Sequence, residues 1–209
     1  MPKKNLVEIV CVIDRSGSMA DIRSDAVGGF NTFLETQKKL PGEAKMTLVL
    51  FNHNSEVLCS RADLRTVKPF TTETYMPDGT TALLDAVGRT IDDVGKALAN
   101  TPEAERPGKV IFAILTDGLE NASKDYTRPR IYEMIREQRA KYAWEFLFLA
   151  ANQDAFAEAE KLCIDRNNAH NFAADSEGIM CAMERICESV SEYRVPGRGK
   201  KKNVAGRLK

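Results

Sequence analysis

The sequence predicts an α/β fold in which a largely parallel sheet is covered by helices on both faces. Runs of apolar and β-branched residues alternate along the chain with segments whose apolar residues recur at helical spacing. The chain has 209 residues, of which 43% are hydrophobic and 29% charged. This length and composition fit one globular domain with a sizeable core and exclude wholesale disorder.

The strands are predicted from short runs of apolar residues that are separated by loops. Residues 6–13 read LVEIVCVI, as expected of a strand buried on both faces. Similar runs predict strands at residues 46–51, 110–115 and 144–150, with a short last strand at 169–172. The stretch 56–70 predicts short, more irregular strands.

The helices are predicted from apolar residues three and four positions apart. Pro41-Gly42 ends the first helix, and Pro129 lies where a first-turn proline is tolerated. The predicted helices cover residues 21–40, 82–99, 128–141, 155–162 and 177–192.

Charge is divided unevenly between the folded part and the C-terminal end. From Arg194 onward there are seven basic residues and no acidic one, which leaves residues 1–193 with a net charge of −7. We therefore expect a domain over residues 1–193 and a basic, disordered tail over residues 194–209. The tail could bind nucleic acid weakly, an anionic membrane or an acidic protein, and a plain solubilising terminus is the alternative. It has no aromatic side chain to stack on bases.

The cysteines and the absence of apolar segments bear on location. The five cysteines are odd in number and form no CxxC pair, which argues against a disulfide framework and a cysteine zinc site. No apolar run approaches the roughly 20 residues that span a bilayer, and the first residues lack a secretory core. These features predict a cytoplasmic protein.

Oxygen-bearing side chains follow the predicted buried strands. Asp14, Ser16 and Ser18 form a D-x-S-x-S pattern directly after the first strand, where an extended loop would turn all three the same way. Asp117 belongs to a Thr-Asp-Gly that follows the strand at 110–115, and Thr80-Thr81 precede a helix. Ligands of parallel sheets lie beyond the carboxyl ends of the strands, so these residues are expected to converge.

The donor types predict the ion and its mode of action. Two carboxylates and three hydroxyls make an oxygen-only site that suits Mg²⁺, with Mn²⁺ or Ca²⁺ as alternatives. Because hydroxyls are neutral, the ion keeps much of its charge and favours an anionic oxygen from outside. A partner's Asp or Glu carboxylate would fit, which makes this a binding device more than a catalytic one.

This combination resembles the von Willebrand factor type A domain and its metal-ion-dependent adhesion site. The resemblance covers residues 5–192 and assigns as ligands Asp14, Ser16, Ser18, Thr81 and Asp117, the last bound directly or through water. Thr81 is favoured over Thr80 because Ala86-Val87 follow it at the family's spacing. The resemblance implies a doubly wound, Rossmann-like sheet with one antiparallel edge strand. It also implies a protein-binding adaptor, and intracellular bacterial members often partner ATPases and other multiprotein complexes.

A metal-dependent hydrolase is the alternative interpretation. Asp21, Asp25, Asp78 and Glu120 could supply the further carboxylates that a Mg²⁺- or Mn²⁺-dependent hydrolase of a phosphorylated or nucleic-acid substrate requires. No histidine stands near Asp14–Ser16 to activate a serine nucleophile, so no catalytic residue is assigned.

Five other residues could contribute to a site. His53 and His170 are interpreted as loop histidines in preference to a catalytic pair. Glu120 and Asn121 are expected on the rim of the metal site, with a solvated loop as the alternative. Arg15 is expected to be exposed, where it could steer an acidic ligand.

Overall fold

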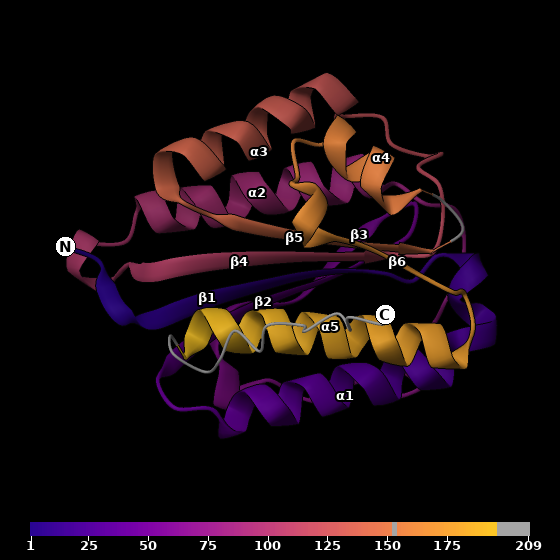
Figure 1. Cartoon of the computed structure of the whole chain (residues 1–209), viewed down its shortest axis with the longest axis horizontal. Coiled ribbons are helices and arrows are strands. Elements are labelled where there is room, and N and C mark those ends of the chain that lie inside the picture. Colours follow the sequence, from indigo (N-terminus) through magenta and orange to yellow (C-terminus); the bar gives the residue numbers. More distant parts are fainter. Residues whose placement is uncertain (152–153, 196–209) are drawn as a thin grey trace, which may run out of the picture.

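Among the described residues, 1–151 and 154–195 of the computed structural model, six strands form one sheet in the order β3-β2-β1-β4-β5-β6 (Figure 1). All neighbours are parallel except β3, an edge strand that runs antiparallel to β2. The strand order reverses between β1 and β4, the switch point of a doubly wound sheet. The predicted fold class is therefore confirmed. The strands are β1 Lys3–Asp14, β2 Glu43–Phe51, β3 Ser55–Asp63, β4 Pro107–Thr116, β5 Glu145–Ala151 and β6 Ala169–Phe172.

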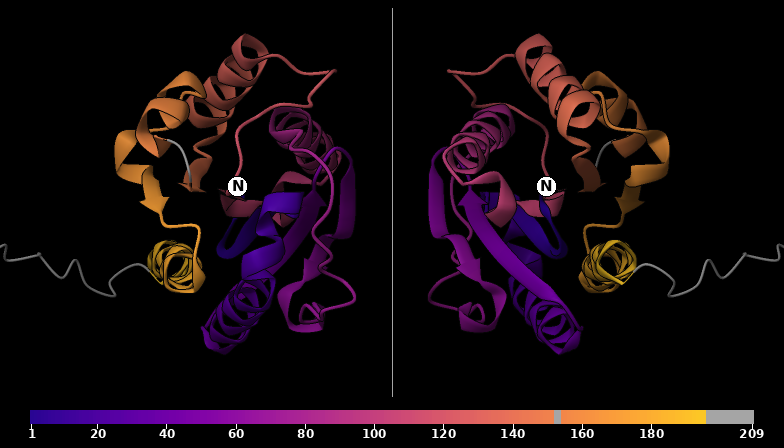
Figure 2. Two further views of the ribbon diagram at one scale, coloured as in Figure 1. Left: turned by 90° about the vertical axis from the view of Figure 1, so that its right-hand side faces the viewer. Right: turned by 90° about the vertical axis from the view of Figure 1, so that its left-hand side faces the viewer.

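Helices cover both faces of the sheet. Helices α1 and α5 pack on one face, and α2, α3 and α4 pack on the other (Figures 1 and 2). The helices are α1 Arg23–Lys39, α2 Leu83–Ala99, α3 Arg128–Tyr142, α4 Ala155–Lys161 and α5 Ser176–Arg194. Short 3₁₀ turns are η1 Gly17–Ile22, η2 Leu64–Thr66, η3 Glu103–Glu105 and η4 Arg166–Asn168.

Side chains alternate across the central strand and so feed two separate cores. Ile9, Cys11 and Ile13 of β1 belong to the core under α1 and α5. Val10 and Val12 belong to the core under α2, α3 and α4. The near-continuous apolar run in the sequence therefore reflects burial of both sheet faces.

One charged side chain lies inside β1. Glu8 is fully buried, and Arg61 Nε of β3 donates to its Oε2 at 3.1 Å. Burial raises the pKa of Glu8, and Arg61 opposes that rise. Arg61 itself reaches inward from a left-handed backbone conformation (φ 49°) and donates to Thr101 Oγ1 at the C-terminal end of α2. The pair ties the edge strand to the centre of the sheet.

Several element boundaries differ from the sequence prediction. The stretch predicted as irregular strands contains one nine-residue strand, β3, followed by the turn η2. Trp144 precedes β5 and is buried against Phe146. Arg194, which we assigned to the tail, ends α5 and donates to Gln37. The rest of the expected tail, residues 196–209, lies outside the described residues.

All five cysteines are free. Within residues 1–151 and 154–195, none of the helices has the length and apolar character needed to cross a membrane.

Candidate metal site

The carboxyl ends of β1 and β4, which the predicted donors Asp14 and Asp117 mark, lie at the edge of the sheet that faces the viewer in the left panel of Figure 2. Asp14 is the last residue of β1 and Thr116 the last residue of β4. These strands are parallel neighbours whose register pairs Ile13 with Leu115. The topology therefore brings Asp14 and Asp117 to the switch point of the sheet.

Asp14 is held by hydrogen bonds on both carboxylate oxygens. Its Oδ1 accepts from the Ser16 backbone N–H at 2.7 Å, and its Oδ2 accepts from Thr116 Oγ1 at 2.5 Å. The side chain is fully buried. Burial, with a smaller contribution from nearby Asp117, raises the pKa of Asp14 to about 6 against the lowering effect of these hydrogen bonds.

The two serines link the first loop to Asp117. Ser18 Oγ donates to Asp117 Oδ1 at 2.6 Å, and the Ser16 and Ser18 hydroxyl oxygens are 3.2 Å apart. The expected extended loop is wrong here, because η1 begins at Gly17 and Ser18 lies in its first turn. The hydroxyls converge because the chain turns after Ser16, and the Gly17 N–H donates to Gly79 O at 3.0 Å.

Thr81 completes the cluster from the loop before α2. Thr81 is buried whereas Thr80 is exposed. A Cβ atom at Gly118 would lie 2.8 Å from Thr81 Oγ1 and 3.6 Å from Ser18 Oγ. Both hydroxyls therefore face the Gly118 backbone. Glycine leaves room for them at this position because it has no side chain. This placement favours Thr81 over Thr80 as the loop donor.

The donor set fits a divalent cation. Burial also raises the pKa of Asp117, against the hydrogen bond from Ser18. Two neighbouring buried carboxylates resist ionising together, and a cation between them would supply the charge that lets both ionise. The described residues hold no group of three or more His, Cys, Asp or Glu side chains arranged for a metal. The site therefore depends on hydroxyls, as the hard oxygen ligands of Mg²⁺ allow.

Glu120 and Asn121, which were expected on the rim of the metal site, form hydrogen bonds beside the donor cluster. Asn121 Oδ1 accepts from the Thr81 N–H at 2.9 Å, and the Asn121 N–H donates to Thr81 O at 3.0 Å. Glu120 Oε2 accepts from the Leu84 N–H at 2.9 Å, so this carboxylate caps α2. Both residues therefore brace the Thr81 loop from outside the donor cluster.

A second set of hydrogen bonds fastens the same loop. Asp85 of α2 accepts from the backbone N–H groups of Lys124, Asp125 and Tyr126 at 2.8–2.9 Å. These donors lower the pKa of Asp85 although its burial acts to raise it. The segment 118–126 and the N-terminal turn of α2 are thus interlocked.

Tyr75 is a supporting residue that the sequence reasoning missed. Its ring is fully buried, stacks on Phe70 and donates from the hydroxyl to Asp14 O at 2.5 Å. The available signal was an aromatic residue isolated in the polar stretch TTETYMPDG. An aromatic in such a stretch indicates a loop that folds back onto the core.

Arg15 is less available than predicted. Its side chain is only 17% exposed and pairs with Glu56 of β3, with Nη1 and Oε2 2.7 Å apart. The expectation that Arg15 projects into solvent is therefore wrong. The pair fixes the first loop to the edge strand.

The remaining candidate catalytic groups do not assemble. His53 lies against Gly79, beyond β2, whereas His170 lies in β6, and β1, β4 and β5 separate those strands. Asp25 accepts from Ser176 Oγ, and Glu120 caps α2. Two of the carboxylates that a hydrolase would recruit are thus bonded elsewhere.

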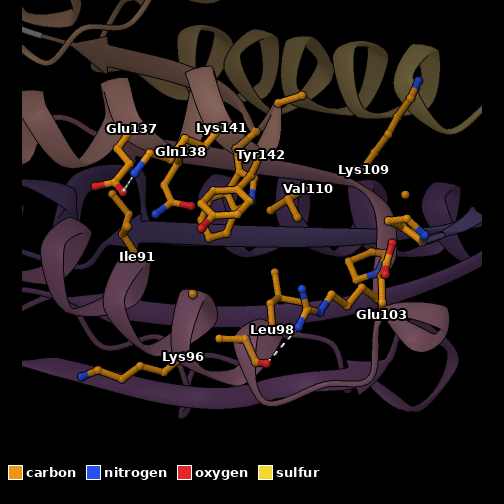
Figure 3. A pocket seen from close by; sticks show the side chains of 18 of the residues that line it. Ile91, Lys96, Leu98, Glu103, Lys109, Val110, Glu137, Gln138, Lys141 and Tyr142 are labelled. Atoms are coloured by element: carbon orange, nitrogen blue, oxygen red, sulfur yellow. Dashed lines mark hydrogen bonds and ion pairs between the residues drawn. The ribbon is translucent and has the colours of Figure 1, made fainter.

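A groove of about 760 Å³ opens at the opposite edge of the sheet, between the C-terminal ends of α2 and α3 (Figure 3). Its polar residues are engaged locally. Lys141 pairs with Glu137, Arg106 donates to the Ala99 carbonyl at the end of α2, and Asp92 accepts from Tyr126. The groove therefore offers no converging set of donors comparable with the one at Asp14 and Asp117.

Solved structures with the same architecture come from several sources. Proximal thread matrix protein 1 of the mussel byssus, with a zinc-occupied MIDAS motif, matches with a TM-score of 0.62 at 11% identity, over 91% of this chain and 49% of that chain. The von Willebrand factor type A structure from Catenulispora acidiphila matches with a TM-score of 0.56 at 17% identity, over 91% of this chain and 43% of that chain. The vWF domain of the type V pili tip protein Mfa5 from Porphyromonas gingivalis gives 0.57 at 14% identity, over 94% of this chain and 99% of that domain.

These likenesses are structural. No protein-family model matches the sequence, and no curated protein is similar enough to be matched. This chain spans about half the length of the mussel protein. The antiparallel edge strand, the reversal of strand order at β1 and β4 and these neighbours lead to one conclusion: the chain has the von Willebrand factor type A fold.

Proposed function

We propose that this protein is a cytoplasmic adaptor that captures an acidic residue of a partner protein through a divalent cation. Asp14, Ser16, Ser18, Thr81 and Asp117 would hold the ion, with Mg²⁺ as the native species and Mn²⁺ or Ca²⁺ as alternatives. The observation that carries the proposal is the convergence of two buried carboxylates and three hydroxyls at one edge of the sheet.

The carboxylates and the hydroxyls would contribute differently to the site. Asp14 and Asp117 supply negative charge from positions that hydrogen bonds hold in place. The neutral hydroxyls complete the shell without cancelling the ion's charge. When bound, the cation supplies a Lewis-acidic position that attracts an external carboxylate. The zinc in the MIDAS of the mussel protein supports a divalent ion in this fold.

The partner is proposed to be a protein that presents an Asp or Glu side chain, such as an ATPase or another component of a multiprotein complex, as for intracellular bacterial members of the family. The hydrolase alternative gains no specific observation, because Asp25 and Glu120 are bonded away from the donors. Phosphatase and nuclease assays with Mg²⁺ or Mn²⁺ are expected to be negative.

The metal site is tested by calorimetric titration with Mg²⁺ of the wild type, Asp14→Asn and Asp63→Asn. Asp63 is the matched control, because it also accepts from a backbone N–H two residues on, at 2.9 Å, but at the far end of β3. Asp14→Asn should weaken Mg²⁺ binding at least tenfold, and Asp63→Asn should leave it unchanged. A wild-type protein that binds none of Mg²⁺, Mn²⁺ and Ca²⁺ would end the proposal.

The adaptor role is tested by capture of partner proteins on immobilised wild type, with Mg²⁺ or with EDTA. The proposal expects a partner that is retained with Mg²⁺, released by EDTA and absent from immobilised Asp14→Asn. A partner retained equally under all three conditions would remove the metal bridge.

A further inference from the structure

Two large apolar side chains are exposed in the loops that carry the proposed metal donors. Leu119 is 58% exposed and Met76 is 60% exposed, whereas most large apolar residues are buried in the two cores. Leu119 follows Gly118, whose Cβ position is 2.8 Å from Thr81 Oγ1. Leu119 therefore lies next to the residue that the Thr81 hydroxyl faces and two residues after the donor Asp117.

Leu119 is held outward by the residues on either side of it. The Gly118 N–H donates to Thr116 Oγ1, and Glu120 accepts from Leu84 N–H, Ala122 N–H and Ser123. These bonds hold the backbone on both sides of Leu119, whose side chain is exposed.

Met76 is fixed in a comparable way. The preceding Tyr75 is buried, with its hydroxyl bonded to Asp14 O, and its own carbonyl accepts from Arg23 Nε at 2.9 Å. Two residues further on, the Asp78 N–H donates to Arg15 O at 2.9 Å. Met76 therefore lies between two residues, Tyr75 and Asp78, that hydrogen bonds hold in place.

The segments that carry the two side chains adjoin different neighbours of β1. Asn52, which follows β2, donates from Nδ2 to Asp78 O, so the Met76 segment lies on the β2 side of β1. Leu119 follows β4, the other neighbour of β1. A segment that reached Asp14 and Asp117 between them would therefore meet an apolar side chain on each side.

We propose that Met76 and Leu119 are specificity contacts for a partner segment in which an acidic residue is flanked on both sides by apolar side chains. This inference rests on the proposed function, because the acidic residue is the one that the cation would attract. Arg15 is already paired with Glu56, so it does not offer the free positive charge that would select a polyacidic partner. Apolar flanks would remove Met76 and Leu119 from water and add affinity beside the carboxylate contact.

The test selects binders from a random linear peptide library on immobilised wild-type protein in Mg²⁺, with elution by EDTA. Peptides with Asp or Glu between Leu, Ile, Phe or Met are expected. The affinity of one selected synthetic peptide is then measured on Met76→Ser, Leu119→Ser and the control Met180→Ser. Met180 is also exposed, at 37%, but lies on α5.

Each serine at position 76 or 119 should weaken peptide binding about tenfold and leave Mg²⁺ affinity unchanged, while Met180→Ser binds like the wild type. Acidic peptides with polar flanks, or serine variants that bind normally, would overturn the inference and leave the proposed function standing. Selected peptides that lack an acidic residue, or that EDTA does not elute, would overturn the proposed function and this inference together.

Discussion

Asn121→Ala tests how the Thr81 hydroxyl is positioned. The substitution removes the Oδ1 atom that accepts from the Thr81 N–H at 2.9 Å and leaves the bond from the Asn121 N–H to Thr81 O intact. Thr81 is only 3% exposed, so its N–H would lose its acceptor in a buried position. The cost of such a group is about 1–3 kcal/mol.

Asn121→Ala should change both the free energy of unfolding and the affinity for Mg²⁺. The free energy of unfolding should fall by about 1–2 kcal/mol, which lowers the melting temperature by roughly 3–6 °C in a chain of this length. The Thr81 hydroxyl would also lose its fixed position beside Ser18, and a misplaced ligand should weaken Mg²⁺ binding about fivefold to tenfold. The first part is measured by urea unfolding in EDTA and the second by Mg²⁺ titration.

Asn171→Ala is the matched control for this experiment. Asn171 Oδ1 also accepts a backbone N–H, from Ala155 at 2.8 Å, and both asparagines are exposed residues. Asn171 lies in the edge strand β6. Asn171→Ala should lower the free energy of unfolding without changing Mg²⁺ affinity. Equal Mg²⁺ affinity in Asn121→Ala and the wild type would refute the claim that Asn121 positions Thr81.

Three further predictions concern the same edge of the sheet. Because burial raises the pKa of Asp14 from its ordinary value of 3.8 to about 6, the folded protein in EDTA binds more protons than the unfolded chain at pH values between these two. The free energy of unfolding of the wild type should therefore fall by up to about 3 kcal/mol relative to Asp14→Asn as pH rises from 4 to 7. Saturating Mg²⁺ should abolish this difference. A free energy of unfolding that rises over this pH range in urea titrations would contradict the prediction. Gly118→Ala places a methyl group 2.8 Å from Thr81 Oγ1 and should weaken Mg²⁺ binding, measured by calorimetry, about tenfold. Unchanged Mg²⁺ affinity would show that the loop moves to make room for the methyl group. Tyr75→Phe removes the hydroxyl that bonds Asp14 O but keeps the ring on Phe70, and should cost about 1 kcal/mol in urea unfolding; a neutral result would count against this bond.

The sequence predicted the fold well because its central elements are strongly patterned. The run at residues 6–13 feeds both cores, so it could only be a central strand. The stretch 56–70 was harder, since β3 is an edge strand with mostly exposed or half-buried side chains and therefore lacks a continuous apolar run. Its antiparallel direction came from the family resemblance and is confirmed.

The donors were easier to predict than the residues that hold them. Asp14 and Asp117 follow strands whose carboxyl ends must share an edge, so their proximity follows from the topology. Asn121 and Thr81 meet across 40 residues of chain, and nothing in local sequence encodes that pair. Ser18 lies in η1 because the chain turns at Gly17, which the alternating spacing alone did not reveal.

The cluster at the switch point also links stretches that are remote along the chain. Ser18 and Asp117 are 99 residues apart, and Thr116 and Asp14 are 102 apart. No short fragment could carry all five oxygens, so cation uptake would report on completion of tertiary structure. An ion that binds only the native state adds about 2.7 kcal/mol of stability at a hundred times its dissociation constant. A bound divalent cation would then connect the loops that follow β1 and β4, and its removal would release both loops at once.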